Sequence, residues 1–240
     1  MISERDADLH MVQILDQTSC YKDMIELMKH VVELNPELTA DERNLLSVSY
    51  KRAINISRNS LQNLTEIIGF QETQSSEARV NQLNIFKQNI IQELEQYCQE
   101  LISIVDNKLL PSAKDVEAKV FYYKLKADYY RYISEAKEGE EKEESSQKAQ
   151  ENYEKAFQLA QAELPKYSPS FLGVVLNYSV FLYDVAQKRQ EAIDLATKTE
   201  QETSILIEQN SEAQINEAVS ILQFLRENIS LWTKSNEENQ

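Results

Sequence analysis

The sequence predicts an all-α protein on three observations. Its 240 residues include only three glycines and four prolines, so the tight turns of antiparallel sheets are scarcely encoded. Glu, Gln, Leu, Ala and Lys, which favour helices, dominate the composition. Apolar residues recur at helical spacing along most of the chain. We expect nine helices with antiparallel neighbours, because the loops between them are short, in one domain over residues 1–233.

Capping residues mark the helices of the first half. Periodicity predicts helices over 5–17 and 21–34. "TADE" at 39–42 is a capping box of Thr39 and Glu42, and it opens a helix to about Ile68 that Gly69 closes. A further helix covers 75–108. Ser112, after Pro111, caps the next one, which runs to about residue 136.

The second half begins with an acidic loop, "AKEGEEKEESS" (136–146), before a helix over 147–163. Ser168 followed by Pro169 places a cap before a proline at the first helical position. A helix over 188–208 comes next, and "SEAQ" (211–214) opens the last one, which ends near Trp232 before a flexible polar tail over 234–240. The stretches 151–164 and 188–202 resemble tetratricopeptide helices, so a helical-repeat scaffold is the first architecture to consider.

Charge and composition exclude several classes of function. With 40 acidic and 25 basic residues, a formal charge of −15, the chain should repel nucleic acid and anionic membranes. The charged N-terminus is unlike a signal peptide, and no apolar stretch approaches the roughly 20 residues that cross a bilayer. Cys20 and Cys98 lie far apart without metal-ligand spacing. We therefore expect a cytoplasmic protein with free thiols.

The motifs of common catalytic sites are missing. Neither His10 nor His30 follows a glutamate by three residues, and there is no Gly-rich phosphate loop, Cys-x-x-Cys or Gly-x-Ser-x-Gly. Most carboxylates have the spacing of solvated helix faces. We expect a protein that is not an enzyme and has no metal or cofactor; a metal assay would expose the alternative of a hydrolase or metalloenzyme.

Two helices carry a lysine and an arginine seven residues apart, which places both on one helical face. Lys124 and Arg131 form one such pair, with Asp128 between them and Tyr132 beside the arginine. Lys51 and Arg58 form the other. If the two helices pack side by side, four cations and a phenol converge on a site that suits a phosphate. The alternative is that Asp128 makes the first pair a structural salt-bridge network.

Two asparagines lie in strongly apolar helices. Asn177 belongs to "LGVVLNYSVFLYD" (172–184), and Asn228 to "SILQFLRENISLW" (220–232). A buried amide needs partners, which neighbouring groups can supply. Alternatively, both amides grip a peptide backbone, each donating and accepting, beside an apolar wall of Leu176, Val180, Ile221 and Phe224.

Four stretches together resemble the 14-3-3 family. "RNLLSVSYKRA" (43–53) and "AVSILQFLRENISLW" (218–232) are similar to its two signatures, and "KVFYYKLKADYYRY" (119–132) and "LGVVLNYSVFLYD" match further family blocks. The resemblance extends from about residue 5 to residue 233. It implies nine antiparallel helices that form a concave groove, usually in a homodimer through the N-terminal helices, and an adaptor that binds phosphoserine and phosphothreonine peptides of client proteins in signal transduction.

The resemblance also implies roles for individual residues. The phosphate is held by the residues matching Lys51, Arg58, Arg131 and Tyr132, and Lys124 and Asp128 belong to the same groove. Asn177 and Asn228 match the asparagines that clasp the peptide main chain. Trp232, with an acid at the position of Asp184, bonds that main chain as well. The apolar wall corresponds to Leu176, Val180, Ile221 and Phe224, with Ser220 beside it.

This chain departs from the family pattern at several positions. Asp184 stands in place of the usual Glu, and Ser220 and Phe224 each stand in place of a Leu, which puts the usual peptide preferences in doubt. In the dimer region, Cys20 replaces an Arg and Asn89 a Lys, so charge pairing is lost. We interpret the chain as a phosphopeptide-binding adaptor that sequesters, clamps or bridges clients; the alternative is a phosphate-independent tetratricopeptide-like scaffold.

Overall fold

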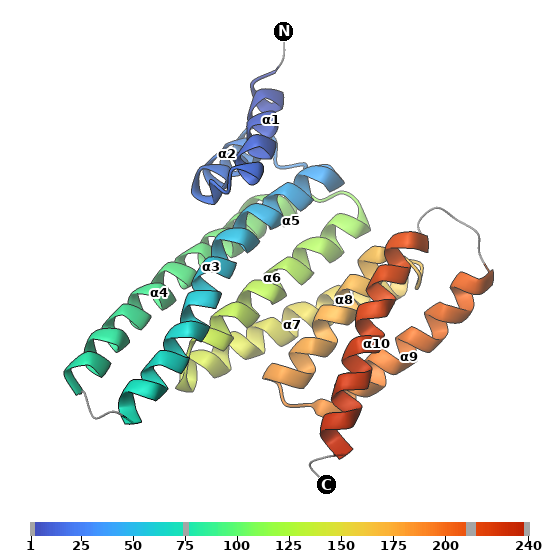
Figure 1. The fold of residues 1–240 in the computed structure, drawn as a ribbon. Coiled ribbons are helices and arrows are strands. Elements are labelled where there is room, and N and C mark those ends of the chain that lie inside the picture. Colours follow the sequence, from blue (N-terminus) through green and yellow to red (C-terminus); the bar gives the residue numbers. More distant parts are fainter. Residues whose placement is uncertain (1–2, 74–76, 210–214, 238–240) are drawn as a thin grey trace. The chain divides into compact units, whose positions relative to one another are not determined.

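The structure, a computed structural model, describes residues 3–73, 77–209 and 215–237, and every regular element in these ranges is helical (Figure 1). In chain order the elements are α1 (Glu4–Gln17), α2 (Tyr21–Leu34), α3 (Ala40–Thr73), α4 (Glu77–Ile104), the π-helix η1 (Val105–Leu109), α5 (Leu110–Ser112), α6 (Val116–Ala136), α7 (Gly139–Glu163), α8 (Pro169–Val180), the π-helix η2 (Phe181–Val185), α9 (Arg189–Gln209) and α10 (Ile215–Glu237). Because α4, η1 and α5 are continuous, as are α8 and η2, the described residues form nine helices. The all-α prediction is confirmed.

The chain divides into two compact units, residues 1–113 with 136–139 (unit 1) and residues 114–135 with 140–240 (unit 2). Unit 1 contains the helices α1 to α5, whereas unit 2 contains nearly all of α6 and α7 and the whole of α8 to α10. The single domain over 1–233 and the concave groove both depend on how the units are placed, so they stay predictions.

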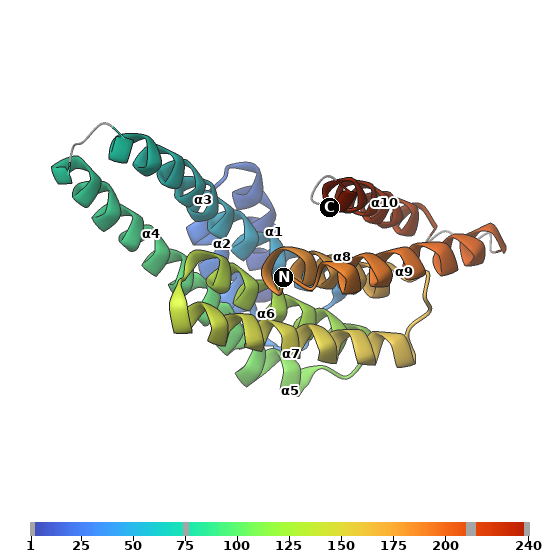
Figure 2. The same cartoon turned by 90° about the horizontal axis from the view of Figure 1, so that it is seen from below.

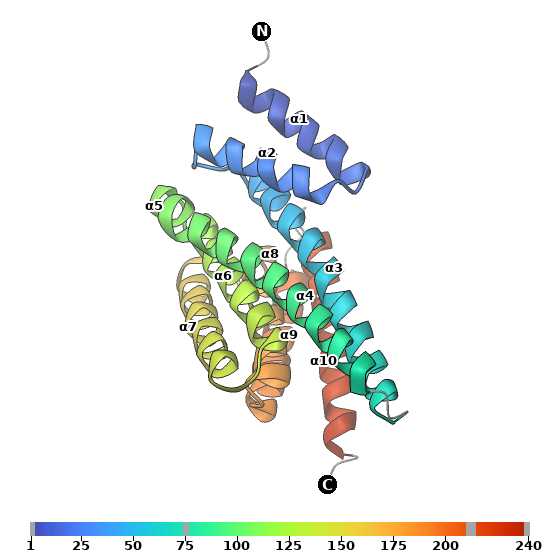
Figure 3. The ribbon, with the colours of Figure 1, turned by 90° about the vertical axis from the view of Figure 1, so that its left-hand side faces the viewer.

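Unit 1 is built around α2, α3 and α4. The long helices α3 and α4 lie side by side, and α2 crosses beside α1 (Figure 3). Fully buried side chains from these helices form its core: Val12, Met24, Ile25, Met28, Leu46, Tyr50, Ile54, Leu94 and Leu101. The Tyr50 hydroxyl donates to Glu100 at 2.5 Å, which satisfies the phenol inside this apolar core and ties α3 to α4.

The capping box at the start of α3 is confirmed. The Glu42 amide donates to Thr39 Oγ1 at 3.3 Å, and the Thr39 amide donates to Glu42 Oε2 at 2.8 Å. Arg5 of α1 donates through both terminal guanidinium nitrogens to the same carboxylate. The side-chain bond from Arg5 is the main cause that lowers the pKa of Glu42. One glutamate therefore caps α3 and fastens α1 to it.

Unit 2 holds α6 to α10. The helices α6 and α7 lie side by side (Figure 2), and the Arg131 guanidinium of α6 donates to the Tyr153 hydroxyl of α7. The core combines small alanines of α7 and α9 with aromatic rings. The ring of Tyr153 stacks on that of Tyr178 with centroids 5.6 Å apart, and Phe181 packs on both. Close helix approach at the alanines and rigid rings between helices fix the positions of the polar groups on α6.

Two of the expected helix starts can be compared with the structure. Ser168 accepts from the Phe171 amide at 3.2 Å, so the cap of α8 is confirmed. The cap at Ser112 is wrong, because Ser112 ends α5 and α6 begins only at Val116. Asp115 is the acceptor there, bonded to the Ala118 amide at 2.6 Å. Pro111 lies in α5, which continues α4 and η1, so this helix ends at Ser112 and not near residue 108 as expected.

The expected helix end at Gly69 is also wrong, since α3 continues to Thr73. A glycine inside a helix costs about 1 kcal/mol relative to alanine, but it ends a helix only where the backbone needs a positive φ. Gly69 has no such φ, and Ile68 beside it is buried. Packing on the core therefore outweighs the low helix propensity.

The predicted acidic loop over 136–146 is largely helix, because α7 begins at Gly139. The chain reverses at Gly139, whose φ is +60°, a conformation that favours glycine. Glu140 and Glu141 then lie in the first turn, where carboxylates interact favourably with the helix dipole. The Lys148–Glu144 pair, 2.6 Å between Nζ and Oε1, adds i,i+4 support.

The last helix is longer than expected. It continues past Trp232 to Glu237, so the first part of the expected tail, residues 234–237, is helical, whereas residues 238–240 and the "SEAQ" cap at 211–214 lie outside the described residues. Cys20 is exposed and Cys98 is buried, and the two form no disulfide. Among the described helices, none combines the length and apolarity that a membrane span needs.

Candidate functional site

The polar face of α6 is organised around Asp128. Helical spacing brings Lys124 one turn before it and Arg131 one turn after it. Lys124 Nζ lies 3.1 Å from Asp128 Oδ2, and Arg131 Nη2 lies 3.9 Å from Oδ1. The side chain of Asp128 is only 7% exposed, against 21% for Lys124 and 11% for Arg131. One buried carboxylate thus fixes both cations, as the spacing predicted.

The charge of Asp128 is stabilised from several sides. Burial opposes its ionisation, but Lys124, Arg131 and the Tyr153 hydroxyl outweigh burial and lower the pKa of Asp128. The Tyr153 hydroxyl donates directly to Oδ1. Asp128 is therefore an anion at neutral pH, surrounded by donors, and it keeps the Lys124 and Arg131 side chains in single orientations.

Arg131 has four neighbours that hold its guanidinium in place. Nε donates to the Tyr153 hydroxyl at 3.3 Å, and Nη1 donates to Glu135 Oε1 at 2.6 Å. The guanidinium carbon lies 4.7 Å from the centre of the Tyr132 ring. Asp128 completes the set. Arg131 and Tyr132 are thereby brought together as a pair, in which the guanidinium lies over the phenol ring.

Asn177 projects from α8 toward the same carboxylate. Its Nδ2 lies 2.9 Å from Asp128 Oδ1 and 3.0 Å from Oδ2. An ionised carboxylate only accepts hydrogen bonds, so the amide nitrogen must face Asp128 and the amide oxygen points elsewhere. The oxygen of Asn177 can then accept a hydrogen bond from a ligand, and the expected double role of its amide toward a peptide backbone stays a prediction.

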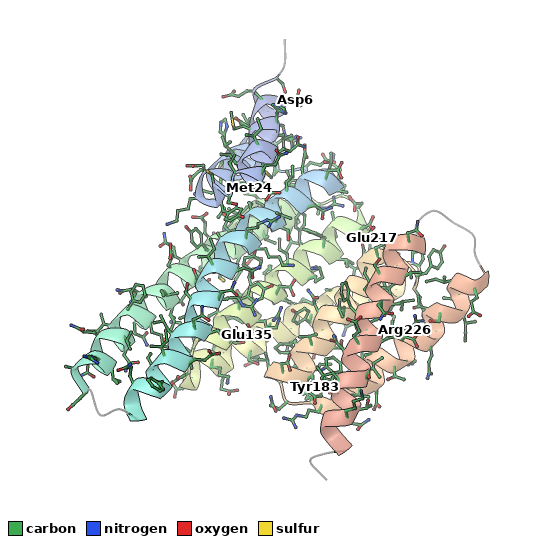
Figure 4. The ribbon with its side chains drawn as sticks, in the orientation of Figure 1. Asp6, Met24, Glu135, Tyr183, Glu217 and Arg226 are labelled. Atoms are coloured by element: carbon green, nitrogen blue, oxygen red, sulfur yellow. The ribbon has the colours of Figure 1, made fainter. Side chains whose placement is uncertain are left out.

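Two residues of this cluster were missed by the sequence reasoning. Glu135, which lies near the C-terminal end of α6 (Figure 4), follows Arg131 by four residues, and this spacing could have identified it. Tyr153 comes from α7, 22 residues beyond Arg131. No local pattern distinguishes it from an ordinary core tyrosine, so only the fold reveals it.

The second Lys–Arg pair belongs to α3 in unit 1. Lys51 is exposed and Arg58 is half-buried. Lys51 lines a hollow of about 450 Å³ together with Arg52, Asn55 and Asn59. The two pairs thus lie in different units, and their convergence on one anion stays a prediction.

The residues of the expected peptide-binding wall lie on α8 and α10 within unit 2. Leu176, Val180 and Ile221 are partly exposed and pack against the core, while 54% of Phe224 is exposed. Ser220 is exposed, and its hydroxyl donates to the Asn216 carbonyl at 3.1 Å. Asn228 is half-buried. Arg226 (Figure 4) fastens α10 to α9 through Glu200 at 2.7 Å.

Trp232 is almost buried, with 4% of its surface exposed. Its ring stacks on that of Tyr183 in η2 (Figure 4), with centroids 4.6 Å apart and planes inclined by 10°, and Arg189 covers the same tyrosine ring. Partial burial, followed by repulsion from Glu135, raises the pKa of the neighbouring Asp184. The stack fixes η2 against α10, so Asp184 and Trp232 lie in one rigid corner of unit 2.

The groups in unit 2 suit recognition more than reaction. The Arg131 guanidinium and the Lys124 ammonium are held by hydrogen bonds, and the guanidinium lies over the Tyr132 ring. Among the residues that the structure describes, no group of three His, Cys, Asp or Glu side chains could hold a metal ion. The arrangement can bind an anionic group attached to an extended, partly apolar chain.

Comparisons with known proteins agree with this geometry. The family model described as "14-3-3 protein" matches residues 11–233. The chain is 39% identical to "14-3-3-like protein GF14 iota" of Arabidopsis thaliana over 230 residues, 96% of this chain and 86% of that protein. It is 36% identical to "Checkpoint signal transducer rad24" of Schizosaccharomyces pombe over 235 residues, 98% and 87% of the two chains. It is also 35% identical to "14-3-3 protein 7" of Solanum lycopersicum over 238 residues, 99% and 94%.

Proposed function

Because the chain belongs to the 14-3-3 family, whose members are phosphopeptide-binding adaptors, we propose that it binds phosphoserine and phosphothreonine peptides through Lys51, Arg58, Arg131 and Tyr132. The observation that carries the proposal is the pairing of Arg131 with Tyr132 by the buried Asp128 cluster. Such preorganised donors bind an anion without an ordering cost at the moment of binding.

The chemistry of the ligand is set by these groups. A phosphorylated side chain brings about −1.5 to −2 charge near neutral pH and three acceptor oxygens. Arginine and tyrosine donors match a tetrahedral anion with several oxygens, whereas a glutamate offers one charge in a plane. Arg131 already has Glu135 as a partner. A phosphate must therefore compete with that carboxylate, which a dianion does better than a monoanion.

The rest of the peptide is proposed to lie along α8 and α10. The free oxygen of Asn177, together with Asn228, Trp232 and Asp184, would bind the main chain. Leu176, Val180, Ile221 and Phe224 would contact its apolar side chains, with Ser220 as a polar notch. Lys124, held by Asp128, supports the phosphate end. Binding at such a groove can sequester, clamp or bridge a client without any catalytic step.

We further propose a homodimer through the N-terminal helices of unit 1. Apolar side chains are exposed on α1, with Met11 46% and Ile14 40% exposed, and on α4, with Ile85 65% and Phe86 55% exposed. Exposed apolar clusters of this kind mark interaction surfaces. Because the interface would be mainly apolar, sedimentation should show a dimer that moderate salt leaves intact. A monomer at tens of micromolar would contradict the dimer.

The remaining features concern the setting in which the protein works. The formal charge of −15 disfavours nucleic acid and anionic membranes as partners. The absence of a disulfide between Cys20 and Cys98 fits a reducing, cytoplasmic location. The family consists of adaptors, and we propose that this chain likewise has no catalytic activity.

The test is a titration with one peptide in its phosphoserine, serine and glutamate forms. We expect strong binding of the phosphorylated form alone, because only this form offers a tetrahedral dianion. Isothermal titration calorimetry measures the three affinities directly. Equal binding of the phosphorylated and unphosphorylated forms would instead identify a phosphate-independent scaffold.

A further inference from the structure

A second hollow, in unit 2, takes no part in the proposed phosphopeptide site. It has a volume of about 650 Å³ and lies between α7, α8 with η2, and α9. This volume is within the range of sites that bind a small molecule or a large side chain. We call it the α7–α9 hollow. Its lining includes none of the residues proposed to contact the phosphopeptide.

The floor of the α7–α9 hollow is apolar and rigid. It consists of Phe157, Tyr178, Leu182 and Leu195, of which Tyr178 and Leu182 are buried. The rings of Phe157 and Tyr178 lie with centroids 6.1 Å apart, and Tyr178 also stacks on Tyr153 beneath it. These packed rings hold one another in place, so the floor of the hollow is an apolar surface that includes aromatic rings.

Its rim carries an excess of negative charge. Glu154 of α7 and Glu191 and Asp194 of α9 line the hollow, with Lys198 as the one ammonium among the lining residues. Glu154 and Asp194 accept hydrogen bonds from Gln150 at 2.7 Å and Gln190 at 2.8 Å. These amides are neutral. Within the described part of the chain, none of the three carboxylates has a cationic side chain at ion-pair distance.

The carboxylates also act electrostatically on the floor. Burial, and then the charges of Glu154 and Glu191, raise the pKa of the Tyr178 hydroxyl. Negative charge from two helices therefore converges above one aromatic ring. A ligand that fits must be cationic to match the rim and flat or apolar to match the floor.

We propose that the α7–α9 hollow binds an arginine side chain of a partner protein, whose guanidinium meets Glu191 and Asp194 while its plane covers the Tyr178 or Phe157 ring. An arginine suits both surfaces at once, because its planar guanidinium is weakly hydrated, stacks on aromatic faces and donates to several carboxylates. A lysine ammonium or a metal ion would match the charge of the rim but lacks the planar face that stacks on the floor. An apolar residue next to the arginine would contact Leu182 or Leu195.

The test uses the full chain and two probe peptides, acetyl-Ala-Leu-Arg-Leu-Ala-amide and the same peptide with citrulline in place of arginine. Citrulline keeps the shape and removes the charge. Binding is measured by NMR through the methyl signals of Leu182 and Leu195. We expect saturable shifts with the arginine peptide and about fivefold weaker binding of the citrulline peptide, the loss expected from two partly exposed charge pairs.

The matched variants are Glu191→Gln with Asp194→Asn, and, as the control on the same helix, Glu208→Gln. Glu208 is exposed and does not line the hollow. The double variant should bind the arginine peptide about fivefold more weakly, and the control should bind it as the wild type does. An equal loss in both would mean general attraction to an acidic protein and would overturn the proposal, as would equal binding of the citrulline peptide or the lack of a saturable shift.

A titration with the phosphopeptide separates the arginine site from the phosphopeptide site. The double variant should keep its phosphopeptide affinity, because neither changed residue belongs to that site. A parallel loss of phosphopeptide affinity would show that the substitutions disturb unit 2 as a whole, and it would remove the support for a separate arginine site.

Discussion

The helices α3 and α6 carry the same Lys–Arg spacing in different surroundings. In α6 the residue between the cations is Asp128, and the network around it is buried. In α3 the corresponding residue is Asn55, and Lys51 remains exposed. The comparison teaches that the seven-residue spacing places two cations on one helical face, whereas the intervening residue decides whether a carboxylate of the same helix lies between them.

The largest effect is expected from making α6 resemble α3. The Asp128→Asn variant leaves the half-buried Lys124 and the buried Arg131 without the carboxylate of Asp128, which should lower the free energy of unfolding by about 3 kcal/mol. Phosphopeptide affinity should fall about tenfold, or about 1.4 kcal/mol, because Arg131 loses its orientation. Urea denaturation and calorimetric titration measure the two quantities. An unchanged urea midpoint would show that the network does not stabilise unit 2.

The Asp128→Asn variant should also differ from the wild type in how its stability depends on pH. The folded state lowers the pKa of Asp128, so its stabilising contribution is fully present above the ordinary Asp pKa, about 3.9. That contribution is lost as pH falls through the lowered folded pKa. The stability of the wild type should therefore decline more steeply in acid than that of Asp128→Asn. Parallel curves would contradict the cause assigned to the shift.

The α3 pair should affect binding without affecting stability. Arg58→Ala, or Lys51→Glu, should weaken phosphopeptide binding by about 2–3 kcal/mol, roughly a hundredfold, because a charge-assisted contact is lost. Melting should hardly change. Arg52→Ala is the matched control: it lies on the same helix and pairs with Asp16 instead. If both α3 variants kept wild-type affinity, the phosphate site would have to lie elsewhere.

The apolar wall should alter selectivity more than affinity. Ser220 and Phe224 are neighbours on one helical face, and we expect the protein to tolerate or prefer a polar residue beside the phosphorylated one. Ser220→Leu with Phe224→Leu should shift this preference by about 1–2 kcal/mol per position. A phosphopeptide array on both proteins measures it. Identical preferences at every flanking position would mean that the two residues are neutral to selectivity.

The smallest effect is the reciprocal exchange in α3. Asn55→Asp places a carboxylate between Lys51 and Arg58 and partly neutralises them. Phosphopeptide affinity should fall by about 1 kcal/mol, with the free energy of unfolding changed by no more than about 0.5 kcal/mol. Titration at low and high salt shows whether the loss is electrostatic. A gain in affinity would mean that the added carboxylate orders the two cations, as Asp128 does in α6.

Local signals carried most of what could be predicted. The caps at Thr39 and Ser168 could be predicted because each hydrogen bond joins residues only three apart in the sequence. The pairing of Lys124 with Asp128 is likewise a matter of helical spacing. The predicted helix end at Gly69 was wrong, because the burial of Ile68 in the core, a tertiary effect, outweighs the low helix propensity of glycine.

What could not be predicted depends on contacts between helices. Tyr153 reaches Asp128 from α7, and nothing in its neighbourhood along the chain shows this role. Asn177 could be recognised as a polar group on an apolar helix, but not that its amide nitrogen would be occupied by Asp128. The predicted acidic loop was wrong for a different reason. A run of glutamates is as suitable for the first turns of a helix as for a solvated loop.

The π-helix η2 makes the corner of unit 2 that holds Asp184 and Trp232 sensitive to chain length. Its Ala186 amide bonds back five residues to the Phe181 carbonyl at 3.0 Å, so this turn accommodates one residue more than an α-helical turn. Deleting a single residue there would restore α-helical geometry and rotate the downstream residues by about 100°. Tyr183 would then leave Trp232. Insertions and deletions in η2, rather than substitutions, are therefore the changes that evolution should tolerate least in this part of the chain.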